Sequence, residues 1–302
     1  MGDPERNDPG KWSEWRVIEL ASKIFTPARG EVVVGTGEDD CAVVDLGNRF
    51  MVLTTDALRE STDFPPQMEE WEKGHMSLAV NLSDVAAMGA EPAYFLYTIS
   101  LPGNYEPEEF FRGMQRLARK YGVDVIGGDT DRGKELCVSG FAVGFSSRVL
   151  LRRNAKVGEK VYLTDITGKA QLSLDQLLSG MSREEIAYPE KLYTPEPRVE
   201  EGLRIPASAC TDISDSLAIS LHQIAKASGV GIELKSELID LSPLEEFVGK
   251  EGAIELFLYA GGDYELVYTC EDCNGMEIGR VVEGKGVYMD GRAVEFRGYQ
   301  HF

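Results

Sequence analysis

The sequence predicts an α+β fold (mixed α/β layers) arranged in two domains. Short apolar runs of β type alternate with amphipathic helical patterns along the whole chain. At 302 residues, the chain is long enough for one large domain or two ordinary ones, each with its own core. A polar, basic segment at 146–159 separates the two halves, so we expect domains at 1–147 and 148–302.

The first half opens with an amphipathic helix over 12–25, where Trp15, Ile18, Ala21 and Phe25 recur at helical spacing. A mostly apolar, buried helix is expected over 73–89, and an amphipathic helix near 107–121 ends at Gly122. Strands are expected at 31–34, 41–46, 50–55, 94–101, 123–126 and 136–145.

The second half continues the alternation of elements. We expect strands at 160–164 and 263–269, helices near 170–180 and 215–228, and either a helix or a strand at 253–259. The stretch 181–206 contains four prolines and is expected to be irregular.

Composition excludes several classes of protein. A net charge of −20 argues against nucleic-acid binding through a basic face. No apolar run approaches the roughly 18–20 residues of a membrane span, and the N-terminal residues lack a signal-peptide core, so we expect a cytoplasmic protein. Five cysteines without framework spacing suggest reduced thiols. The lone pair Cys270 and Cys273 has no neighbouring histidines that would favour zinc.

Five short acidic segments lie beside apolar runs, at 37–40, 54–56, 81–84, 127–131 and 212–215. Carboxylates at strand ends and on apolar helices repel one another unless a cation neutralises them. Hard divalent cations take oxygen ligands from Asp, Thr and backbone carbonyls. Each aspartate alone could be a helix cap or a turn residue, but the five segments together favour a cluster of cations that handles phosphate.

Other phosphate-handling motifs are missing. Gly168-Lys169 is followed by Ala170, which excludes a P-loop, and the glycines at 35 and 37 are followed by Asp40 where a dinucleotide-binding loop needs Gly. Protein-kinase, nucleophile-elbow and H-E-x-x-H motifs are also absent. Phosphoryl transfer needs positioning and charge neutralisation, which bound Mg²⁺ and arginines provide. The arginines in or near the acidic segments are Arg132, Arg152, Arg153 and Arg198.

Over nearly its whole length the chain resembles thiamine-monophosphate kinases, a family within the aminoimidazole-ribonucleotide synthetase-like superfamily of ATP-binding proteins. The long central motif and the C-terminal motif are specific to this family. The matching segments are Gly37-Glu-Asp-Asp-Cys-Ala42, Thr54-Thr-Asp56, Ala79-Val-Asn-Leu-Ser-Asp-Val-Ala-Ala-Met-Gly-Ala90, Ile126-Gly-Gly-Asp-Thr-Asp-Arg-Gly133, Leu151-Arg-Arg153, Asp212-Ile-Ser-Asp215, Gly261-Gly-Asp-Tyr-Glu-Leu266 and Arg297-Gly-Tyr-Gln-His-Phe302.

The resemblance implies transfer of the ATP γ-phosphate to thiamine monophosphate, with several Mg²⁺ ions as cofactors and ADP as the second product. It also implies the two-domain fold of the superfamily and a homodimer whose N-terminal domains pair, with sites in grooves between domains and subunits. Because the acceptor phosphate is already an oxyanion, it implies no general base, and we assign no catalytic residue.

The resemblance carries three sets of site residues over to this sequence. The magnesium-ligand positions are Asp40, Thr54, Thr55, Asp56, Asp84, Asp129, Asp212 and Asp215. The nucleotide contacts are Gly128, Asp129, Arg153 and Ser214, and the substrate contacts are Asp63 and Tyr299.

Three positions depart from the family pattern. Asp63 stands where the family often has a substrate-contacting His, and Ser216 stands where it usually has Gly. The segment 261–266 is one residue short and lacks a Glu that the resemblance places toward the substrate.

Two alternative functions stay open. One is another ATP-dependent enzyme of the superfamily, although the reactive cysteines of its selenide-activating and hydrogenase-maturation branches are missing. The other is a non-catalytic nucleotide- or metal-binding module. A purely structural, acidic interaction protein is less favoured, because its aspartates would not need apolar flanks.

Overall fold

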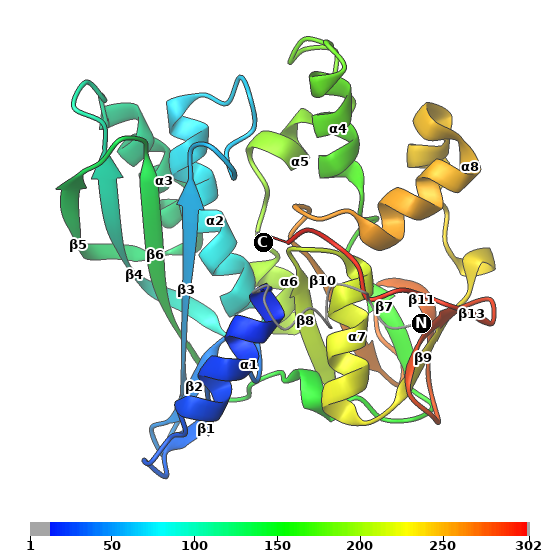
Figure 1. Ribbon diagram of the computed structural model, residues 1–302. Coiled ribbons are helices and arrows are strands. Elements are labelled where there is room, and N and C mark those ends of the chain that lie inside the picture. The colour runs from blue at the N-terminus through cyan, green and yellow to red at the C-terminus, as the bar shows by residue number, and fades with distance from the viewer. Residues whose placement is uncertain (1–12, 301–302) are drawn as a thin grey trace.

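The computed structural model describes residues 13–300 and contains two mixed sheets flanked by helices (Figure 1). The first sheet has the order β1-β2-β3-β6-β4-β5, in which β4 and β5 are parallel and the other neighbours antiparallel. Its strands are β1 (Val32–Val34), β2 (Ala42–Asp45), β3 (Phe50–Arg59), β4 (Glu91–Leu101), β5 (Asp124–Arg132) and β6 (Cys137–Ser146).

The second sheet has the order β13-β12-β9-β11-β7-β10-β8, with a single parallel pair, β9 and β12. Its strands are β7 (Lys160–Leu163), β8 (Ala209–Ile213), β9 (Gly231–Leu234), β10 (Glu265–Cys270), β11 (Met276–Val282), β12 (Gly286–Met289) and β13 (Arg292–Ala293). Mixed, largely antiparallel sheets of this kind confirm the predicted α+β class.

Eight α-helices and two short 3₁₀ helices are found in the described residues 13–300. The α-helices are α1 (Glu14–Ile24), α2 (Glu70–Ala87), α3 (Glu108–Tyr121), α4 (Lys169–Leu178), α5 (Pro189–Tyr193), α6 (Val199–Arg204), α7 (Leu217–Ser228) and α8 (Ser242–Tyr259). The 3₁₀ helices are η2 (Arg152–Asn154) and η3 (Ser236–Leu238).

The buried helix α2 lies against the first sheet and against α3, and it is nearly free of exposed residues. Its close approach to α3 depends on two glycines. A Cβ on Gly74 would lie 1.8 Å from the Phe110 carbonyl oxygen, and one on Gly113 would lie 1.7 Å from the Trp71 carbonyl oxygen. Close packing of the two helices fixes the position of α2, which carries one of the acidic segments.

Each sheet packs against its own large hydrophobic core, and the segment 181–206 contributes side chains to both cores. Residues 181–206, expected to be irregular, contain α5 and α6, whose side chains Leu192, Tyr193 and Val199 are buried in the first core. The chain therefore enters the second half, returns to contact the first, and then forms β8. This path brings residues distant in sequence to the junction between the sheets.

Several predicted elements have different limits in the structure. The strand expected at 123–126 continues to Arg132, so the acidic segment 127–131 lies within β5 and not in a loop. Residues 253–259 are the last part of α8. Strands β8, β9, β11, β12 and β13 have no counterpart in the sequence prediction, because they are short or flanked by glycines and polar residues.

Cys270 and Cys273 form a disulfide, so the expectation of reduced thiols is wrong for this pair. Cys41 and Cys210 are free and buried, and Cys137 is free and half-buried. Among residues 13–300, no helix is both long and apolar enough to cross a membrane.

Candidate active site

Three carboxylates from distant parts of the sequence meet at the junction of the two sheets. Asp40 lies in the turn between β1 and β2, Asp84 on α2, and Asp212 on β8. One carboxylate oxygen from each lies within 4.8 Å of the others. Asp39 lies beside Asp40, and its side chain is also buried. We call Asp39, Asp40, Asp84 and Asp212 the acidic cluster.

Hydroxyl groups orient the carboxylates of the acidic cluster. Thr54 donates a hydrogen bond to Asp84 (2.5 Å), Ser83 donates to Asp212 (2.6 Å), and Thr211 donates to Asp40 (2.9 Å). Each hydroxyl holds one oxygen of its acceptor and thereby directs the other, so the cluster is preorganised.

Arg152 contributes a positive charge by forming an ion pair with Asp40, and its backbone N–H donates to Asp39 (3.0 Å). The second oxygen of Asp40, Oδ2, is buried and has no hydrogen-bond partner among the described residues. An unpartnered buried carboxylate oxygen costs free energy unless a cation binds it. This oxygen therefore fits the requirement of a metal ligand.

Burial and mutual repulsion raise the pKa values of the acidic cluster. Burial and the neighbouring Asp40 raise the pKa of Asp39 to about 7 and that of Asp212 to about 8. Burial, followed by the charges of Asp56 and Asp212, raises the pKa of Asp84 well above its ordinary value. These shifts mark a site that holds more negative charge than the protein alone neutralises.

A pocket of about 300 Å³ opens beside the acidic cluster, between the first sheet with α2 and the loops of the second half. Asp84 and Asp212 line it, together with apolar side chains that include Met76, Val80 and Leu174. The pocket thus joins a strongly acidic wall to an apolar wall. Such a surface suits a ligand with a phosphate at one end and rings at the other.

Several residues singled out from the sequence gather at this pocket. Thr54 and Asp56 lie on one face of β3, and the backbone N–H of Asp56 donates to the Asn81 side chain (3.2 Å). Asp56 lines the pocket together with Asp63, Ser214, Asp215 and Tyr299, whereas Thr54 contacts Asp84 beside it. Thr55 lies on the opposite face of β3, and its hydroxyl donates to the carbonyl of Gly140 (2.7 Å).

Gly128 and Asp129 lie apart from the acidic cluster within the same chain. They belong to β5, an edge strand whose nine residues are all exposed. Asp129 is aligned through β4 and β6 with Ala57 of β3. Three strand spacings of about 4.8 Å place it about 14 Å from that strand. One chain alone therefore does not assemble every predicted ligand.

Arg153 is exposed on η2 and borders a surface hollow with Arg148 and Lys156, whereas its neighbour Arg152 reaches the acidic cluster. The sequence contains both arginines in one motif and does not show which one turns inward. Asp39, Arg152 and Glu14 are pocket or cluster residues that the sequence analysis did not assign. A possible signal for the first two was the direct adjacency of each to an assigned residue.

The two remaining departures from the family pattern have structural explanations. Ser216 has an extended backbone (φ −178°), so glycine is not needed; its hydroxyl caps α7 at Ile219 and donates to the carbonyl of Arg297 (2.8 Å). In the shortened segment 261–266, Asp263 is buried and accepts hydrogen bonds from the backbone at Gly168 and Ala170, at the start of α4. Its carboxylate therefore supports α4 rather than lining the pocket.

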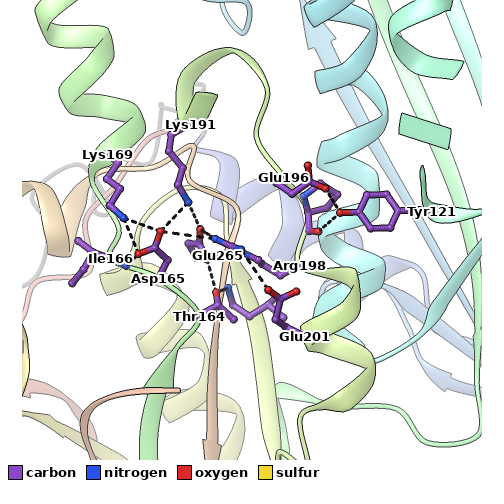
Figure 2. Close-up of polar contacts among 12 residues, drawn as sticks. Tyr121, Thr164, Asp165, Ile166, Lys169, Lys191, Glu196, Arg198, Glu201 and Glu265 are labelled. Carbon is purple, nitrogen blue, oxygen red and sulfur yellow. Dashed lines mark hydrogen bonds and ion pairs between the residues drawn. The ribbon is translucent and has the colours of Figure 1, made fainter. Parts of the chain in front are cut away.

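A second group of charges, partly buried, surrounds Glu265, the residue that follows Tyr264 (Figure 2). Lys191 and Arg198 both contact Glu265, at 2.6 Å each, and Lys169 contacts Asp165 at 2.7 Å. Thr164 donates to Glu265 (2.5 Å), and Arg198 also approaches Glu201 (3.4 Å). We call this group the balanced network; its carboxylates are Asp165, Glu201 and Glu265, and its cations are Lys169, Lys191 and Arg198.

Comparisons with known proteins agree with this geometry. Residues 38–146 match the family model described as AIR synthase related protein, N-terminal domain. The thiamine-monophosphate kinase of Archaeoglobus fulgidus is 50% identical, over 96% of this chain and 98% of the relative. The chain belongs to the thiamine-monophosphate kinase family. The enzyme of that name from Aquifex aeolicus is 35% identical, over 96% of this chain and 98% of its own length.

Solved structures place the whole fold in the same family. A structure described as AaThiL complexed with AMPPCP and TMP superposes with a TM-score of 0.86 at 31% identity, covering 96% of this chain and 97% of that one. Thiamine-monophosphate kinase from Stenotrophomonas maltophilia gives a TM-score of 0.76 at 32% identity, covering 94% and 98%. The hydrogenase maturation protein HypE of E. coli, at 20% identity, a TM-score of 0.67 and coverage of 93% and 96%, shares the fold.

Proposed function

We propose that this protein transfers the γ-phosphate of ATP to thiamine monophosphate, giving thiamine diphosphate and ADP, with Mg²⁺ bound at the acidic cluster. The observation that carries the proposal is the meeting of Asp40, Asp84 and Asp212 within 4.8 Å, beside a pocket with one acidic and one apolar wall. Relatives named thiamine-monophosphate kinase, one at 50% identity over 96% of this chain and one at 38% over 88%, support the choice of substrates. We also propose a cytoplasmic location, in keeping with the use of ATP.

The residues of the acidic cluster fit Mg²⁺. They supply hard oxygen donors, and the unpartnered Oδ2 of Asp40 is buried among them. Asp40, Asp84 and Asp212 would hold the ions, with Thr54 and Asp56 adjacent on β3. When bound, Mg²⁺ neutralises the phosphate oxygens on which negative charge accumulates during transfer.

The reaction needs no proton transfer by the protein. A terminal oxygen of the thiamine monophosphate phosphate bonds to the γ-phosphorus of ATP. The bond from that phosphorus to the β–γ bridging oxygen breaks, and its electron pair leaves with ADP. The protein's own residues contribute by holding the reactants: the hydroxyls of Thr54 and Ser83 fix two carboxylates, and Asn81 fixes the backbone at Asp56.

We further propose a homodimer in which β5 of one subunit approaches the acidic cluster of its partner. The support is the exposure of this edge strand over its full length, with Ile126 58% and Val125 39% exposed, next to exposed Tyr94 and Phe141. A long exposed edge with apolar side chains favours pairing with another chain. Pairing of this kind would bring Gly128 and Asp129 to a site that a single chain leaves incomplete.

The function is tested by incubating the protein with ATP, Mg²⁺ and thiamine monophosphate and separating the products by chromatography. We expect equal amounts of thiamine diphosphate and ADP, and no product when EDTA replaces Mg²⁺. Mg²⁺-dependent ATP binding without thiamine diphosphate would contradict the proposal and favour a non-catalytic nucleotide-binding module. ADP formation with another acceptor would favour a different enzyme of the superfamily.

The shared site is tested by complementation between two inactive variants, Asp84→Asn and Asp129→Asn. Random mixing of subunits makes half of the dimers mixed, and one of the two sites in each mixed dimer is intact, so activity should return to about one quarter of the wild-type value. Co-expression of the two chains allows the mixing. Activity that stays at the level of the separate variants would show that Asp129 does not act across the interface.

A further inference from the structure

The N-terminal helix and the C-terminal tail meet at the mouth of the interdomain pocket. Glu14, the first residue of α1, lines the pocket together with Tyr299 of the tail. In Figure 1 the beginning of α1 lies near the last described residues of the chain, between the two sheets. The pocket therefore includes a carboxylate from a helix that carries none of the acidic segments.

Contacts on two sides hold Glu14 in place. Ser13 caps α1, and the indole of Trp15 packs edge-on against Phe296 of the tail, with ring centroids 5.2 Å apart. Next to Phe296 the tail is bound to the second domain: the N–H of Tyr299 donates to the carbonyl of Asp215 (3.2 Å). These contacts make the position of Glu14 a property of the folded chain.

On the other side, α1 lies against the turn that carries Asp40. Gly37 has φ +73°, and a Cβ there would lie 2.8 Å from the side chain of Ile18. The helix thus spans from the metal-binding turn to the tail. Glu14 is half-buried at the end of the helix nearest the tail.

The electrostatic surroundings indicate how the pocket is oriented. Tyr264 is surrounded by Asp56, Asp212, Asp215 and Asp63, whose charges add to the effect of burial in raising the pKa of its phenol. For Tyr299 the acting charges, after burial, are those of Asp63, Asp215 and Glu14. Asp63 and Asp215 act on both phenols, whereas Asp56 and Asp212 act on Tyr264 alone and Glu14 on Tyr299 alone.

The placement of Asp212 near Tyr264 and of Glu14 near Tyr299 fits the proposed substrate, and the inference rests on the proposed function. The phosphate of thiamine monophosphate must lie at the acidic cluster, where the ions and ATP are. Its thiazolium and aminopyrimidine rings then extend along the pocket toward Tyr299. The aminopyrimidine is the end of the molecule farthest from the phosphate, and its exocyclic amino group is a hydrogen-bond donor.

We propose that Glu14 is a specificity-determining residue, whose carboxylate accepts a hydrogen bond from the exocyclic amino group of the aminopyrimidine. A carboxylate is an acceptor only, so it selects a donor at this position. The shortened segment 261–266 provides no carboxylate here, because its acidic residue Asp263 supports α4. Glu14 supplies that acceptor from the opposite end of the chain.

The test compares Glu14→Gln with the wild type in steady-state kinetics. We expect the KM for thiamine monophosphate to rise about fivefold to tenfold, because the Gln carbonyl can still accept the hydrogen bond but without the charge that strengthens it. The kcat value and the KM for ATP should stay within about twofold, since Glu14 touches neither phosphate. Glu19→Gln, a change at an exposed residue of the same helix, is the matched control and should match the wild type.

A second substrate tests the chemistry directly. Oxythiamine monophosphate carries a carbonyl in place of the amino group. The wild-type preference for thiamine monophosphate over this analogue, measured as a ratio of kcat/KM, should fall at least about tenfold in Glu14→Gln, because the Gln amide can donate to a carbonyl.

An unchanged KM and an unchanged preference in Glu14→Gln would overturn the inference while leaving the proposed function intact. A parallel loss of kcat and of affinity for both substrates, with a lowered melting temperature, would also overturn it, because that pattern indicates a structural role. If the wild-type protein forms no thiamine diphosphate at all, the proposed function itself fails.

Discussion

The acidic cluster and the balanced network are two buried groups of carboxylates built in opposite ways. In the acidic cluster four aspartates meet the guanidinium of Arg152, and the pKa values of Asp39 and Asp212 rise to about 7 and about 8. In the balanced network three carboxylates meet three cations (Figure 2). There, burial alone would raise the pKa of Asp165, but Lys169 and Lys191 lower it below its ordinary value.

The difference in charge balance distinguishes a group that holds the fold together from a group that binds a ligand. A balanced set of buried charges is complete without a ligand and fixes the segments it joins, here the connector carrying Lys191 and Arg198 against β10. An unbalanced set is complete only when a cation binds. We therefore propose a structural role for the balanced network and a cation-binding role for the acidic cluster, and four predictions test that division.

The largest effect is expected from Asp84→Asn. Removing one ligand charge should lower the rate of thiamine diphosphate formation about a thousandfold, because metal neutralisation of the phosphates is worth several kcal/mol. Stability in EDTA should not fall, since the change removes a repelling charge. The rate is measured by product chromatography and the stability by urea unfolding. Near-normal turnover would remove Asp84 from the metal site.

Glu265→Gln in the balanced network is expected to lower stability while leaving most of the activity. Loss of this carboxylate, which is 1% exposed, leaves Lys191 and Arg198 without their main partner and should lower the free energy of unfolding by about 3 kcal/mol. At 20 °C the folded variant should keep its Mg²⁺ requirement and most of its kcat. Glu201→Gln, at a more exposed member of the same network, is the control and should cost less than about 1 kcal/mol.

The two groups also predict opposite dependences on pH. In EDTA the pKa of Asp39 is raised from 3.8 to about 7 and that of Asp212 from 3.8 to about 8. At pH values between 3.8 and these raised pKa values, the two carboxyl groups therefore hold more protons in the folded protein than in the unfolded chain. The free energy of unfolding should therefore fall as pH rises through this window, and saturating Mg²⁺ should remove the slope. Asp165 has a lowered pKa, so its contribution is present above 3.8 and is lost only at lower pH. Urea unfolding checks the acidic cluster from pH 5 to pH 8.5 and Asp165 from pH 5 down to about pH 3, and stability in EDTA that rises between pH 5 and pH 8.5 would contradict the first prediction.

The smallest effect is expected at Arg153, the exposed neighbour of Arg152. If Arg153 contacts the nucleotide, Arg153→Ala should raise the KM for ATP about tenfold and leave the Mg²⁺ dependence unchanged. Arg204→Ala, another exposed arginine, serves as the control. An unchanged KM would leave Arg152 as the arginine of this motif that belongs to the site.

Some parts of the fold and of the acidic cluster have a clear pattern in the sequence, and others have none. The sequence correctly indicated α3 from its periodic apolar face and α2 from its mostly apolar run, and the alternation of such elements indicated the α+β class. The acidic segments indicated the carboxylates Asp40, Asp84 and Asp212, which meet in the acidic cluster, because an aspartate beside an apolar run is costly without a partner. The weakly patterned strands β11 to β13 had no such signal.

Other parts of the site depend on geometry that a linear pattern does not contain. Two adjacent arginines in one motif look alike, and only the packing of η2 turns Arg152 toward Asp40 and leaves Arg153 exposed. Glu14 lines the pocket where the Trp15–Phe296 contact holds α1 against the C-terminal segment. Neither relation leaves a pattern of spacing in the sequence.

The most direct test of the central claim is calorimetric titration of the protein with Mg²⁺ at pH 7, with the non-cleavable analogue AMPPCP present. We expect saturable binding that releases protons from the acidic cluster, seen as a dependence of the heat on the buffer. The binding should be lost in Asp84→Asn and kept in Glu19→Gln. Equal Mg²⁺ binding by the wild type and Asp84→Asn, with no proton release, would contradict the account.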